Sequence, residues 1–100
     1  MSLTREQQRN TIDEFAENMR RLDVTAADIA ASLGSSPSYV DQVVHLHARN
    51  LEDPWVVRNW LIEHGRERGI ELEPFTALTG DWHRYWFLDG GYIDRGRLAL

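Results

Sequence analysis

The spacing of apolar residues predicts a long amphipathic helix over residues 5–22. Thr4 and Gln7 have the spacing of a capping box, in which each side chain satisfies a backbone N–H at the other residue. Apolar side chains then recur at intervals of three and four, which places them on one helical face. These residues are Ile12, Phe15, Ala16, Met19 and Leu22.

Two shorter apolar patterns follow and predict two helices joined by a tight turn. Thr25 is suited to cap the first helix, and Gly34 is suited to end it in a left-handed conformation. Ser36 and Pro37 then supply a cap and a first helical residue for the next helix. The side chains expected between the two helices are apolar, and the small Ala30 would let them cross closely. They are Ile29, Ala30, Leu33, Val40, Val43 and Val44.

A fourth helix is predicted to run from a cap at Asp53, with Pro54 in its first turn, to about Arg68. Gly69 would end it. The weak alternation and the proline that follow predict a crossing loop over residues 70–79. Its anchors in the core would be Leu72, Phe75 and Leu78.

The C-terminal part is less regular. Asp81 can cap a short helix over residues 82–88, which Gly90 and Gly91 would close, and the tail over 92–100 is expected to be ordered only in part. Residues 70–100 would therefore wrap the helices with an aromatic-rich segment. The complete pattern predicts one all-α domain over residues 1–100, with about five helices.

Composition narrows the class of protein. Cysteine is absent, which excludes disulfides, thiolate metal sites and a cysteine nucleophile. The net charge of −5 argues against a basic protein that coats nucleic acid. No apolar run is long enough to span a membrane, and the polar N-terminus lacks a signal core. We therefore expect a cytoplasmic protein without a membrane partner.

Candidate catalytic and metal-binding residues are few. Asp41 and His45 would share a helical face, but His47 would point elsewhere and further ligands are lacking. The carboxylates are not isolated as general acid–base catalysis requires, and the serines lack the sequence context of a nucleophile. We predict that the protein is not an enzyme and holds no metal or cofactor.

The segment over residues 26–45 has the spacing of a helix-turn-helix. Its Ile-Ala pair, Leu-Gly, serine-rich turn and Ser-Tyr-Val step resemble the phage-repressor branch of that motif. The resemblance implies that the second helix of the pair enters the major groove of double-stranded DNA. The residues that would face the bases are Ser36, Ser38, Asp41, Gln42 and His45. The residues that would contact phosphates are Arg20, Arg21, Arg49 and Arg58.

The predicted recognition helix, the second of the pair, carries no basic side chain on its exposed face. Every basic residue of the chain is an arginine, and residues 24–50 contain only Arg49 against Asp28 and Asp41. Since phosphate contacts dominate affinity for DNA, binding would be weak or would depend on a dimer. The alternative is a non-enzymatic interaction module, in which the two helices are a scaffold and another protein is the partner.

Aromatic residues concentrate in the C-terminal half. In a helix over residues 82–88, Trp82, Tyr85 and Trp86 would form one stripe. Such a stripe packs into the core or forms the centre of an interface, where aromatic residues are favoured. We predict a homodimer interface through these residues, while core packing remains the other interpretation.

The wider sequence resembles one group of small bacterial proteins, catalogued as domain of unknown function 2316. The likeness covers nearly the whole chain. Its segments are Leu-Glu-Asp-Pro-Trp at 51–55, Pro-Phe-Thr-Ala-Leu at 74–78, Tyr-Trp-Phe-Leu at 85–88 and Tyr-Ile-Asp-Arg-Gly at 92–96. The resemblance implies a compact helical bacterial protein and supplies no activity.

Overall fold

The computed structural model describes residues 3–98 and confirms the all-α class. Its α-helices are α1 (Arg5–Leu22), α2 (Ala26–Leu33), α3 (Pro37–Val44), α4 (Asp53–Arg68) and α5 (Gly90–Arg95), and a 3₁₀ helix spans Trp82–Arg84. Over residues 3–98 no strand is present. None of the helices in this range is long and apolar enough to cross a membrane.

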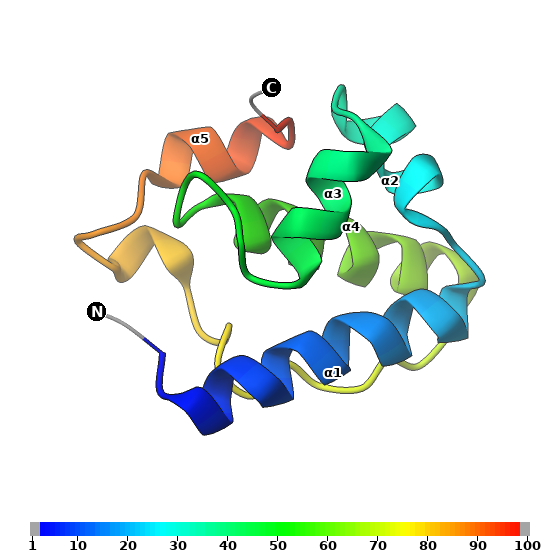
Figure 1. Ribbon diagram of the computed structural model, residues 1–100, viewed down its shortest axis with the longest axis horizontal. Coiled ribbons are helices and arrows are strands. Elements are labelled where there is room, and N and C mark those ends of the chain that lie inside the picture. The colour runs from blue at the N-terminus through cyan, green and yellow to red at the C-terminus, as the bar shows by residue number, and fades with distance from the viewer. Residues whose placement is uncertain (1–2, 99–100) are drawn as a thin grey trace.

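Helix α4 is the centre of the packing. Helices α1, α3 and α5 all pack against it, and α2 packs against α3 (Figure 1). The α4 side chains Val56, Val57 and Leu61 are almost completely buried, together with Phe15 of α1 and Val40 of α3. Burial on several sides explains why α4 shows no clear amphipathic pattern.

Helix α1 begins as predicted, and its buried face differs from the prediction at Ala16 and at two polar residues. Thr4 and Gln7 form the capping box, and Phe15 and Leu22 are buried. Ala16, which the pattern placed on the buried face, is exposed, whereas Glu14 and Asn18 are buried. The loop after α4 runs back along this side of α1, and its backbone supplies hydrogen-bonding partners for these polar side chains (Figure 1).

Helices α2 and α3 confirm the predicted caps and core. Thr25 forms a capping box with Asp28, and the Ser36 hydroxyl accepts a hydrogen bond from the Tyr39 N–H. Gly34 ends α2 with φ +71°, a left-handed conformation that glycine adopts without the Cβ penalty. The six apolar residues predicted to face the core, from Ile29 to Val44, are all buried.

The predicted N-cap of α4 is wrong. Asp53 is the first helical residue, and the N-cap position belongs to Glu52, which makes no side-chain capping bond. The Asp53 carboxylate is fully buried and accepts hydrogen bonds from the hydroxyls of Tyr39 and Tyr92. Tertiary partners therefore replace the local backbone as its hydrogen-bond donors.

The C-terminal segment departs most from its prediction. Asp81 caps a helix as predicted, but that helix ends at Arg84. Gly90 and Gly91 begin α5, with Asp89 as N-cap, and do not close the preceding helix. A Cβ on Gly90 would lie 2.8 Å from Cδ2 of His83, so the absence of a side chain lets the two segments approach.

The C-terminal tail is ordered over more residues than predicted. Its first residues form α5, and Leu98 is buried, with its N–H donating a hydrogen bond of 3.0 Å to the Leu33 carbonyl at the end of α2. Residues 99–100 of the predicted tail lie outside the described residues. The C-terminal segment thus returns to the turn between α2 and α3.

Candidate functional site

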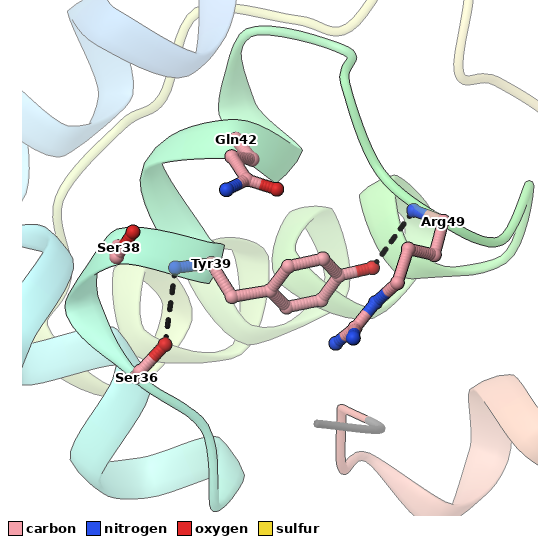
Figure 2. Close-up of a pocket in the computed structure, with 5 residues that line it drawn as sticks. All are labelled: Ser36, Ser38, Tyr39, Gln42 and Arg49. Atoms are coloured by element: carbon pink, nitrogen blue, oxygen red, sulfur yellow. Dashed lines mark hydrogen bonds between the residues drawn. The ribbon is translucent and has the colours of Figure 1, made fainter.

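A pocket of about 260 Å³ lies along α3, from its N-cap Ser36 to Gln42 in the second turn, beside the loop that carries Arg49 (Figure 2). It is lined by Ser36, Ser38, Tyr39, Gln42 and Arg49. The structure thus brings together three residues predicted to face DNA bases and one predicted to contact phosphate. Tyr39 is the member of this group that the sequence analysis did not select.

Local structure fixes the polar side of this pocket. Ser36 caps α3, and Pro37 follows it in the first turn. Ser38 and Gln42 are four residues apart and therefore lie on one face of the helix, where both are exposed. The N-terminal end of a helix carries a partial positive charge and favours negatively charged ligands.

Tyr39 holds the following loop against α3. Its hydroxyl accepts a hydrogen bond of 3.0 Å from the Arg49 N–H, and the Arg49 guanidinium lies 4.2 Å from the centre of the Tyr39 ring (Figure 2). A cation over an aromatic face is attracted by the ring quadrupole. Arg49 is therefore positioned beside α3, although it lies on a loop after that helix.

The buried carboxylate of Asp53 holds the Tyr39 hydroxyl in place. The Tyr39 hydroxyl donates to Asp53 at the start of α4, and the Tyr92 hydroxyl of α5 donates to the same carboxylate at 2.6 Å. Burial raises the pKa of Tyr39, and the hydrogen bond to Asp53 raises it further. This polar cluster joins α3, α4 and α5. Its sequence signal was the Asp-Pro pair, whose aspartate was interpreted as a cap.

A second arginine reaches the turn between α2 and α3. The guanidinium of Arg97 lies against Gly34, in the space that a Cβ at that position would occupy. The hydrogen bond between Leu98 and Leu33 brings the C-terminal segment to this place. Sequence reasoning missed Arg97 because it lies more than 60 residues from the turn along the chain, and no local pattern connects the two segments.

The other residues predicted to face bases lie further along α3. Asp41 and His45 are both exposed, and neither lines the pocket. His45 Nδ1 lies 2.7 Å from the Asp41 carbonyl oxygen and 3.6 Å from its carboxylate. Within residues 3–98, no three histidine or carboxylate side chains are grouped so as to hold a metal ion.

The other three arginines predicted to contact phosphate, like Arg49, bind groups of the protein, but at places away from α3. Arg20 and Arg21 both pair with Glu17 at 2.7 Å, and these hydrogen bonds lower the pKa of Glu17 to about 2. Arg58 is half-buried; its Nε donates to the Leu78 carbonyl at 2.8 Å. The α3 pocket is lined by Arg49 and by none of these three.

The predicted aromatic stripe is not formed, because residues 85–88 turn away from a helical path. The rings of Trp82 and Tyr85 pack against Trp55, with centroids 6.2 and 5.9 Å away. The Tyr85 hydroxyl also donates to the Thr79 carbonyl at 2.8 Å. Trp86 points outward and is 89% exposed, so of the three predicted interface residues it alone stays mainly on the surface.

His83 connects the 3₁₀ helix to α5. Its Nδ1 lies 2.7 Å from the Asp81 carboxylate and its Nε2 lies 2.6 Å from that of Asp94. Asp94 also accepts a hydrogen bond from the Trp82 indole N–H at 3.0 Å. These contacts raise the pKa of His83, the bond to Asp94 contributing most, and the bond from His83 lowers the pKa of Asp94. The pKa of Asp81 is lowered first by a hydrogen bond from the His83 backbone N–H and then by the His83 ring.

This cluster predicts a pH dependence of stability. Since the pKa of His83 is raised on folding, its contribution is complete below the unfolded value near 6.5 and is lost as pH rises through the folded value. The aspartates contribute above their unfolded pKa and lose that contribution as pH falls through their lowered values. We expect the stability difference between the parent and His83→Gln to be largest between about pH 4 and 6.5.

Thermal unfolding from about pH 4 to 9 measures this difference. The matched control is His47→Gln, which changes an exposed histidine on the loop between α3 and α4. Its melting profile should follow that of the parent protein. Superimposable profiles for the parent and His83→Gln would show that the cluster does not stabilise the fold.

The structure defines a small all-helical domain with a polar pocket along α3. The model of the family described as "Uncharacterized protein conserved in bacteria (DUF2316)" matches residues 1–89. The chain belongs to this family. No curated protein matches it, and no solved structure matches it.

Proposed function

We propose that α2 and α3 form a helix-turn-helix of the phage-repressor type that binds double-stranded DNA. The supporting observation is the α3 pocket, where Ser38 and Gln42 on the exposed face of α3 lie together with Arg49 of the following loop. In this class of motif the second helix enters the major groove and its N-terminal residues contact the bases.

The exposed side chains of α3 suit limited base recognition. The Gln42 amide can pair with N6 and N7 of adenine, and the Ser38 hydroxyl can reach a base or a phosphate. Asp41 can accept a hydrogen bond from cytosine N4 and repels phosphate. We therefore propose that the protein recognises a short DNA site, in which Gln42 discriminates most strongly between base pairs.

Arginines beside α3 supply the proposed phosphate contacts. Arg97 lies at the turn before this helix, and Arg49 lies on the loop after it. With about two or three contacts per chain and two chains per site, log affinity should change with log salt with a slope of about −4 to −5. We propose a dimer for this reason: one chain alone offers few cations.

Fluorescence anisotropy on random and genomic duplexes at about 50 mM salt tests the proposal. We expect Arg97→Ala to weaken binding to all duplexes alike and to flatten the salt slope by about one unit. Gln42→Ala should change the preference at one base pair by about 1–3 kcal/mol. The matched control is Arg66→Ala, because Arg66 is an exposed arginine of α4, paired with Glu63.

The stoichiometry and the affinity measured in this titration test the dimer and the DNA partner. Saturation at two chains per duplex supports the dimer. No binding to any duplex at tens of micromolar protein would reject DNA as the partner. The interaction-module interpretation would then take first place, with the exposed Trp86 as the first residue to test.

A further inference from the structure

A larger pocket, of about 660 Å³, lies apart from the α3 pocket. It is enclosed by the N-terminal turn of α1, the loop between α3 and α4, the first turn of α4 and two parts of the C-terminal segment. Trp55, Leu78 and Leu88 form its buried wall, whereas Leu51 on its rim is 60% exposed. Pockets that hold small molecules have volumes of about 300–1,000 Å³.

The lining of this pocket is mainly apolar and carries no charged side chain. None of its residues is an Asp, Glu, Arg or His, and the Tyr85 hydroxyl is already bound to the Thr79 carbonyl. A charged ligand would lose its hydration there without gaining a counter-charge. The rings of Trp55, Tyr85 and Phe87 offer faces and edges for contact with another ring.

Three amide side chains, of Gln7, Gln8 and Asn50, line the pocket and can orient a ligand. The Gln7 side-chain oxygen accepts a hydrogen bond of 2.9 Å from the Thr4 N–H, and the Gln8 side-chain nitrogen donates one of 3.1 Å to the Leu3 carbonyl. This leaves the Gln7 nitrogen as a donor and the Gln8 oxygen as an acceptor. Apolar walls with a few polar groups are typical of small-molecule sites.

We propose that this pocket binds a small, uncharged, aromatic molecule that carries a hydrogen-bonding group. The volume, the absence of charge in the lining and the three aromatic side chains define this ligand class. The site and its residues are separate from the proposed DNA contacts, so it is tested without DNA. A second copy of this chain, inserting a side chain, is the competing occupant.

N-phenyl-1-naphthylamine is a suitable probe, because it is uncharged, aromatic and carries one N–H donor. We expect its fluorescence to increase and shift to the blue on binding, with saturation at one probe per chain and a Kd on the order of 10–100 µM. Ala48→Phe should abolish this signal by filling the pocket from its loop side. Leu51→Ser should weaken binding about 5–10-fold by removing an apolar side chain from the rim.

The matched control is Ile62→Ser, which removes an exposed aliphatic side chain of α4 that does not line the pocket. Its Kd should equal that of the parent protein. Circular dichroism checks that each variant is folded. If Ala48→Phe does not fold, the binding measurement on Leu51→Ser tests the proposal instead. The proposal is overturned if fluorescence does not change, or if all variants respond equally. It is also overturned if sedimentation shows a dimer that Leu51→Ser dissociates, because a second copy then fills the pocket.

Discussion

Asp53→Ala is expected to lower the free energy of unfolding by about 3 kcal/mol. The carboxylate is fully buried and accepts hydrogen bonds from Tyr39 and Tyr92, so its removal leaves two tyrosine hydroxyls without their acceptor. Hydrogen bonds to a charged group contribute about 1.5–3 kcal/mol each. Release of the desolvation cost of the carboxylate offsets part of this loss.

Chemical denaturation monitored by circular dichroism measures the change. Asp53→Asn keeps the shape and one acceptor, so it should cost less than Asp53→Ala, and Tyr92→Phe should cost about 1.5 kcal/mol by removing one of the two bonds. The matched control, Asp13→Ala, changes an exposed aspartate of α1 and should stay within about 0.5 kcal/mol of the parent. Equal stabilities for Asp53→Ala and Asp13→Ala would contradict a stabilising role for the cluster.

The same substitution links stability to the proposed site. Tyr39 lines the α3 pocket, and its hydroxyl accepts a hydrogen bond from the Arg49 N–H. Asp53 holds that hydroxyl in place. Asp53→Ala should therefore shift the amide resonance of Arg49 in a folded sample. An unchanged Arg49 resonance would show that Asp53 does not position this side of the pocket.

Asn18→Ala is expected to lower the free energy of unfolding by about 2–3 kcal/mol. The Asn18 side chain donates to the Glu73 carbonyl at 2.9 Å and accepts from the Glu73 N–H at 2.7 Å. Alanine would remove both hydrogen bonds of a fully buried side chain, and each such bond contributes about 0.5–1.5 kcal/mol. The loop after α4 would then lose one of its attachments to α1.

Urea denaturation and hydrogen exchange test this prediction together. Exchange of the Glu73 amide should accelerate in Asn18→Ala more than exchange of amides in α2 and α3, because the loss is local to the loop. Asn10→Ala is the matched control, since Asn10 is an exposed asparagine of the same helix. Asn18 would be shown not to hold the loop if both variants were equally stable and Glu73 exchanged at the parental rate.

Local signals in the sequence determined most helix boundaries. The capping boxes at Thr4 and Thr25, the cap at Ser36 and the left-handed Gly34 depend on residues within a few positions of one another. Their hydrogen bonds form inside a single turn of the chain, and so the sequence pattern predicts them. The apolar core of α2 and α3 follows from periodicity for the same reason.

Only the tertiary structure decided the roles of the polar residues. Asp53 resembles a cap, and Asn18 resembles a solvent-facing residue, until the segments that supply their partners are brought close. The partner of Asn18 lies 55 residues away along the chain, a separation over which no periodic pattern extends. Buried polar groups are satisfied by whichever backbone or hydroxyl group arrives from another segment.

The candidate site divides in the same way. The sequence by itself determined that Ser38 and Gln42 share one exposed face of a helix, because a helical repeat fixes that relation. The tertiary structure decided that Arg49 and Arg97 lie beside that helix and that Arg20, Arg21 and Arg58 lie elsewhere, at Glu17 and Leu78. Charge is a property of the sequence, but its position depends on long-range packing, which local spacing does not encode.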